Sequence, residues 1–70
     1  MARKLQVVAY QQGWDVIYEG AKYAESHHAS RMDAVAAAVD QACREGAVLE
    51  IFDAEGHLCS QRRLPHAALA

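Results

Sequence analysis

The sequence predicts a single α+β domain in which an antiparallel sheet of four to five strands packs one face against one helix. Three observations support this. The chain has 70 residues, the length of one small domain. One stretch has the composition and the caps of a helix. Short runs of β-branched and aromatic residues flank that stretch on both sides. We place the structured core at about residues 5–64.

The chain opens with a predicted hairpin. Leu5–Tyr10 is rich in residues that favour strands, and Trp14–Glu19 alternates apolar with polar residues. Gln11-Gln12-Gly13 between them predicts a turn in which Gly13 takes a positive φ. In the second strand, one face would carry Trp14, Val16 and Tyr18, and the other Asp15, Ile17 and Glu19.

The predicted helix is Arg31–Glu45. Ser30 is a suitable N-cap, Asp33 places a negative charge in the first turn, and Gly46 fits the left-handed position after the last turn. The preceding stretch, Lys22–His28, is either a third strand or a connection. Steps of 100° gather the helix's apolar residues on one side: Met32, Val35, Ala36, Val39, Ala42 and Cys43. Because most are small, we expect the helix to lie close to the sheet over a thin core.

A second hairpin follows the helix. Its predicted strands are Ala47–Phe52 and His57–Arg62. The turn Asp53–Gly56 joins them, with Gly56 suited to a left-handed conformation. Pro65 ends the regular structure.

The composition excludes several classes of protein. A net charge of −2 argues against strong nonspecific binding to nucleic acid. No apolar run approaches the ~18 residues of a membrane span, and no secretory signal is recognisable, so we expect a cytoplasmic protein. We expect Cys43 and Cys59 to be reduced thiols in or near the core, although a disulfide between them stays open. Basic residues would form a small patch if the two ends of the chain meet: Arg3, Lys4, Arg62, Arg63 and His66.

The residues that carry chemistry elsewhere have plainer explanations here. His27 and His28 are adjacent, so in a strand they would point to opposite faces and could not share a metal ion. Ser30 is accounted for as a cap, and Ser26 has no recognisable triad around it. The four glycines are dispersed and form no phosphate-binding loop. We therefore expect no catalytic activity, no metal and no cofactor.

The sheet face that the helix cannot cover predicts a contact surface. If Trp14, Val16, Tyr18, Leu49, Ile51 and Leu58 face the helix, the other face still carries Ile17, Val48, Phe52, Cys59 and either Val8 or Tyr10. Exposed apolar patches usually mark a binding surface, and a homodimer is the simplest occupant. We expect Ile17, Val48 and Phe52 to mediate self-association, unless the sheet curls enough to shelter both faces. The alternative is a nucleic-acid-associated accessory domain that uses Tyr23, Arg62 and Arg63.

Four short motifs resemble a family of small bacterial domains of unknown function. They are Gly13-Trp14-x-Val16-x-x-Glu19-Gly20-Ala21, Ala24-x-Ser26-x-His28, Ser30-x-x-Asp33-Ala34-Val35 and the turn Glu55-Gly56. The departures are Ser30 for the family's Thr, Asp33 for Glu, Glu55-Gly56 for Asp-Gly, and Tyr23 where relatives often carry Arg. The resemblance implies a compact α+β domain without an established activity, and it carries over no catalytic residue.

Overall fold

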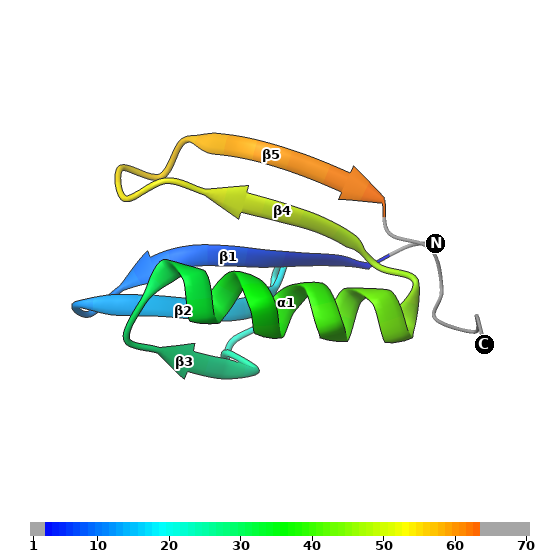
Figure 1. The fold of residues 1–70 in the computed structure, drawn as a ribbon, viewed down its shortest axis with the longest axis horizontal. Coiled ribbons are helices and arrows are strands. Elements are labelled where there is room, and N and C mark those ends of the chain that lie inside the picture. The colour runs from blue at the N-terminus through cyan, green and yellow to red at the C-terminus, as the bar shows by residue number, and fades with distance from the viewer. Residues whose placement is uncertain (1–2, 64–70) are drawn as a thin grey trace.

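The computed structural model describes residues 3–63 of the chain (Figure 1). The elements are β1 (Lys4–Tyr10), β2 (Gly13–Tyr18), β3 (Ser26–His28), α1 (Arg31–Glu45), β4 (Val48–Phe52) and β5 (Leu58–Arg63). The strands form one sheet in the order β3-β2-β1-β4-β5. The expected end of regular structure at Pro65, the last core position 64 and the histidine His66 lie outside the described residues.

The predicted α+β architecture is confirmed, with α1 packed on one face of the sheet (Figure 1). The sheet is mostly antiparallel, but β1 and β4 pair in parallel. The reason is the path of the chain, because α1 returns it to the end of the sheet where β1 begins (Figure 1). β4 therefore starts beside the start of β1 and runs in the same direction.

Both ends of α1 are capped as predicted. The Ser30 hydroxyl accepts a hydrogen bond from the Asp33 backbone N–H at 3.1 Å. Gly46 has φ 67°, and its N–H donates to the Ala42 carbonyl. The Tyr18 hydroxyl donates to Glu45, while Gln41 donates to that hydroxyl at 3.1 Å, so the last turns of the helix are tied to β2.

The predicted buried face of the helix is wrong in part. The residues buried against the sheet are Ala34, Ala38 and Ala42, a row spaced by four. Met32 is 75% exposed and Val39 38% exposed, although both were assigned to the buried side. The physical reason is the close approach of helix and sheet, because only methyl side chains fit along the line of nearest contact.

The core lies between this alanine row and the sheet. Its buried members on the strands and beside them are Leu5, Val7, Val16, Tyr18, Ala47 and Leu49. Trp14, Val35, Ala37 and Ile51 pack around them and stay partly exposed. The predicted common face of Trp14, Val16 and Tyr18 is confirmed, since the first packs against the cluster to which the other two belong.

The first turn differs from the prediction. Gln11 and Gln12 take the positive φ values, 47° and 61°, whereas Gly13 is the first residue of β2. Gly13 is needed for space, because a Cβ there would lie 2.5 Å from the His28 carbonyl oxygen and 2.7 Å from His27 Nε2. Gly13 thus leaves room for β3, whereas the conformation of the turn does not depend on it.

The strands at both edges of the sheet also differ from the prediction. Only Ser26–His28 of the stretch 22–28 forms a strand. The pairing of β4 with β5 is irregular between Ile51 and Phe52, and Leu58 lies opposite Phe52. The assignment of Leu58 to the helix-covered face is therefore wrong, and α1 does not reach β5 at all.

Candidate interaction surface

The sheet face opposite α1 carries the three residues predicted to mediate self-association. Gln6 pairs across the sheet with Ile17 on β2 and Glu50 on β4, so their side chains share a face. The neighbouring residues Leu5, Val7 and Leu49 point to the helix and are buried in the core. Ile51 points the same way and packs against that core. Val48 and Phe52 lie two positions either side of Glu50 and belong to the same face. The three predicted residues are each partly buried.

A hydrogen-bonded polar row crosses this face. Gln6 Nε2 donates to Glu50 Oε1 at 2.9 Å, and Gln61 Nε2 donates to Glu50 Oε2 at 2.6 Å. Glu50 is only 6% exposed. Two amides satisfy its carboxylate, which lets it lie at low exposure in the middle of the sheet. No motif in the sequence indicates this row; its one signal is the acidic residue at an alternating position within an apolar strand.

The histidines of β3 point to opposite faces, as predicted. His27 Nδ1 lies 2.5 Å from Asp15 Oδ1 on the face away from the helix. The Ser26 hydroxyl lies 2.8 Å from His28 Nε2. Asp15 and Ser26 thus bind different imidazoles, and these residues do not form a Ser-His-Asp triad.

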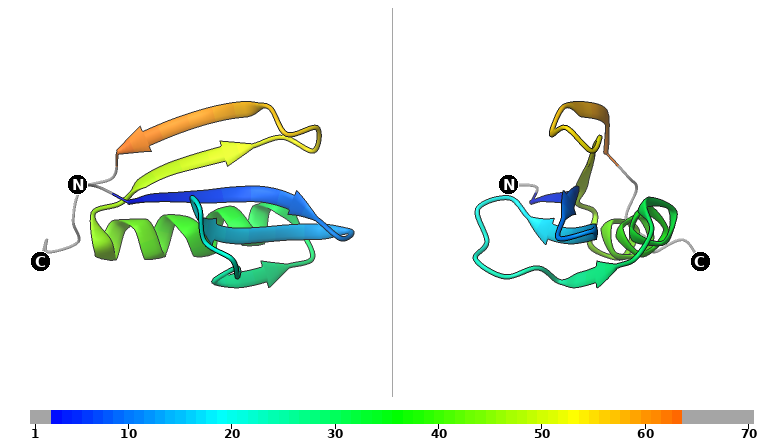
Figure 2. Two further views of the ribbon diagram at one scale, coloured as in Figure 1. Left: turned by 180° about the vertical axis from the view of Figure 1, so that it is seen from behind. Right: turned by 90° about the vertical axis from the view of Figure 1, so that its left-hand side faces the viewer.

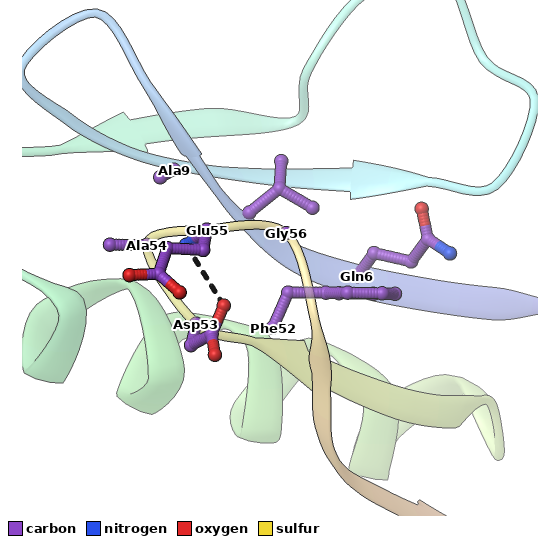
Figure 3. A pocket seen from close by; sticks show the side chains of 8 residues that line it. Gln6, Ala9, Phe52, Asp53, Ala54, Glu55 and Gly56 are labelled. Atoms are coloured by element: carbon purple, nitrogen blue, oxygen red, sulfur yellow. Dashed lines mark hydrogen bonds between the residues drawn. The ribbon is translucent and has the colours of Figure 1, made fainter.

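A hollow of about 460 Å³ lies where β1 ends beside the β4–β5 hairpin (Figure 3). Gln6, Val8 and Phe52 line it from the strands, and residues 53–56 line it from the hairpin turn. The hollow therefore combines apolar side chains with the carboxylates of Asp53 and Glu55. This site contains Phe52, one of the predicted residues, but neither Ile17 nor Val48.

The hairpin turn is organised by Asp53. Its Oδ1 accepts the backbone N–H groups of Glu55 and His57, each at 2.9 Å. The hydrogen bond from His57 is the main cause that lowers the pKa of Asp53 below its ordinary value. Potential ligand atoms of Asp53, Glu55 and His57 lie within 4.8 Å of one another, an arrangement that was not predicted. Its only signal in the sequence is that the three residues follow one another at intervals of two across a turn. The turn itself accounts for the position of Asp53.

β5 forms an exposed edge of the sheet (Figure 2). Leu58 is 49% exposed. Ser60 is partly buried, and the other residues of this strand are exposed. Cys59 is exposed and Cys43 is half-buried, and no disulfide joins them. The expectation of a core or near-core position is therefore wrong for Cys59, because the helix does not extend over β5.

The two ends of the described chain lie at the same end of the sheet with β4 between them, and Tyr23 lies apart from both. Lys4 pairs with Val48, which pairs with Arg63, so basic residues of β1 and β5 lie at one end of the sheet. Tyr23 is 82% exposed on the connection between β2 and β3, beside the opposite edge. The structure thus brings Arg62 and Arg63 towards Lys4 and separates them from Tyr23.

These features define a small α+β domain with one helix on a mixed five-stranded sheet and an uncovered face and edge. The chain belongs to the family described as "Uncharacterized protein conserved in bacteria (DUF2188)", whose family model matches residues 5–63. Neither the comparison with curated proteins nor that with solved structures gives a match. Within residues 3–63, no helix is long and apolar enough to cross a membrane.

Proposed function

We propose that this chain is a noncatalytic interaction module that self-associates through the surface that α1 leaves uncovered. The observation that carries the proposal is the one-sided coverage of the sheet. α1 packs against β1 to β4 on one face, while Ile17, Val48 and Phe52 lie on the other. Apolar side chains on an uncovered face are a typical feature of protein contact surfaces.

The polar groups of this face support a binding role rather than a catalytic one. Glu50 is held by two amides, and Asp15 is held by His27. Groups engaged with one another in this way shape a surface, because each is held in place by its hydrogen-bond partner. A second copy is the simplest partner, since a twofold axis applies the same surface twice.

The test is the absolute mass in solution, measured by light scattering after size exclusion over a series of concentrations. We expect a dimer for the unmodified chain. Phe52→Glu should weaken dimerisation at least about tenfold while the fold persists, because a charge replaces an aromatic contact. Met32→Glu is the matched control, since Met32 is an exposed apolar residue on the helix. A monomer at every concentration would refute self-association, and an undiminished Phe52→Glu dimer would refute this surface.

The second candidate is a nucleic-acid-associated accessory domain. The approach of Arg62 and Arg63 to the start of β1 favours it, because it concentrates positive charge at one end of the sheet. This proposal predicts binding of a single-stranded oligonucleotide that weakens with salt. Arg62→Ala with Arg63→Ala should reduce the binding and its salt dependence, as measured by fluorescence anisotropy, whereas Arg44→Ala on the helix should not.

A further inference from the structure

The two edges of the sheet are unequal. β3 has three residues, whereas β5 has six and forms the edge beyond the reach of α1. Alternate backbone N–H and C=O groups of an edge strand point away from its one neighbour and are available to another strand. β5 contains no proline that would interrupt such pairing. It is therefore the edge of this sheet that is suited to accept a further strand.

The charges along this hairpin are segregated. Asp53 and Glu55 lie in the turn that precedes β5, and Arg62 and Arg63 end the strand. All of β5 beyond Ser60 is exposed. Among residues 3–63, neither arginine forms a salt bridge. β5 is thus preceded by acidic residues and ends in basic ones.

We infer that two copies of the chain join along β5 in antiparallel orientation, about a twofold axis, and form one continuous sheet. This inference rests on the proposed self-association and narrows the contact to the β5 edge, where Val48 and Phe52 lie on the neighbouring strand and Ile17 lies outside the contact. Antiparallel pairing brings the basic end of each β5 to the acidic turn of the other copy. Parallel pairing would instead align the arginines of the two copies with each other, which charge repulsion disfavours.

The charge match also specifies a register. If Arg63 lies beside the acidic turn of the second copy, the twofold axis passes close to Cys59, the residue that the irregularity of this strand pair leaves without a partner on β4. Because a disulfide can join residues whose Cα atoms are about 4.4–6.8 Å apart, the two Cys59 thiols then come within range of a cross-link. In this register each Arg63 also approaches the turn that borders the hollow containing Phe52.

Arg62 and Arg63 can also be explained as residues that prevent association. The test must distinguish this role from pairing with the acidic turn. Charged residues on an edge strand commonly prevent sheets from joining. If Arg62 and Arg63 act in that way, their removal strengthens association. If they pair with the acidic turn, their reversal weakens it. The sign of the effect therefore decides between the two roles.

The experiment uses charge reversal and rescue, read by light scattering. Arg63→Glu and Glu55→Arg should each weaken the dimer at least about tenfold, and the double variant should recover most of the loss. Asp53 is left unchanged because it organises the turn. Arg44→Glu, on the outer side of α1, is the control and should leave the mass unchanged.

Oxidative cross-linking supplies an independent readout of the register. In a Cys43→Ser background, diamide should link two chains through Cys59 into a disulfide-bonded dimer. The control carries its one thiol on the helix, as Cys43→Ser, Cys59→Ser and Ala36→Cys, and should stay uncrosslinked at the same concentration.

The outcomes separate this inference from the proposed function. A wild-type monomer would overturn both. A wild-type dimer that is indifferent to both charge reversals, or that is strengthened by Arg63→Glu, would leave self-association standing and overturn pairing along β5. Failure of the double variant to recover would overturn the Arg63–Glu55 contact, and absence of the Cys59 cross-link would overturn the register.

Discussion

At the scale of single residues, the first hairpin shows how neighbouring positions divide two tasks. Gln11 and Gln12 occupy the left-handed conformation that a two-residue hairpin turn requires. Gly13 has no such φ, yet a side chain there would collide with β3. The turn therefore carries backbone strain in non-glycine residues, while the glycine beside it serves packing.

This division predicts opposite effects of two substitutions. Gln12→Gly should stabilise the fold by about 1 kcal/mol, because a left-handed backbone costs glycine little. Gly13→Ala should destabilise it by about 1–3 kcal/mol, because β3 must shift to admit the methyl group. Thermal unfolding followed by circular dichroism would measure both. An increase in stability on Gly13→Ala would show that β3 can shift without an energetic penalty.

The acidic turn predicts a pH dependence. The lowered pKa of Asp53 means that its ionised form stabilises the folded hairpin. This contribution is fully present above the ordinary value of 3.8 and is lost as the pH falls through the lowered folded value. The protection of the Glu55 and His57 amides from hydrogen exchange, relative to the intrinsic rate at each pH, should therefore fall in acid. Asp53→Asn should remove this dependence; if it persists unchanged, another group causes it.

At the scale of elements, α1 is adapted to its distance from the sheet. Its alanine row at Ala34, Ala38 and Ala42 is fully buried, so each methyl group determines how close the helix can lie. The longer apolar residues of the helix flank this row or face solvent. Hydrophobicity alone placed Met32 and Val39 on the buried side together with Val35 and Ala42, because it ranks both above alanine.

Enlarging the middle of the row should be costly. Ala38→Leu is expected to lower the free energy of unfolding by about 1–3 kcal/mol, because the added carbons have no space between helix and sheet. Val39→Leu, at the adjoining and partly exposed position, should change it by less than about 0.5 kcal/mol. Urea unfolding of both variants provides the comparison. Equal effects would contradict a closely packed alanine row.

At the scale of the whole molecule, the sheet is wider than its single helix can cover. β5 receives packing from β4 alone, and the opposite sheet face carries a mixture of apolar residues and hydrogen-bonded polar ones. A chain of 70 residues buries a limited core, so association is an available source of further stability.

Coupling between folding and association predicts a concentration-dependent melting temperature. If copies associate in the folded state only, the Tm should rise as the protein concentration rises, because mass action favours the folded dimer. Differential scanning fluorimetry over a hundredfold range, about 1–100 μM, would detect it. The Phe52→Glu variant should show a flatter response. A constant Tm in the unmodified chain would argue against self-association in this range.

Local patterns in the chain were sufficient for the helix with both caps, the approximate strands and the left-handed Gly56. They also placed Ile17, Val48 and Phe52 on one face. These features depend on residues close in sequence, where period and capping chemistry decide the structure.

Contacts between distant segments decided the rest. The parallel β1–β4 pair, the alanine row, the role of Gly13 and the position of Leu58 depend on where α1 and β3 lie in space. So does the hydrogen bond between Gln6 and Glu50, which are 44 positions apart along the chain. No local period encodes such distances, because close approach and long-range hydrogen bonds exist only once the sheet and helix have packed together.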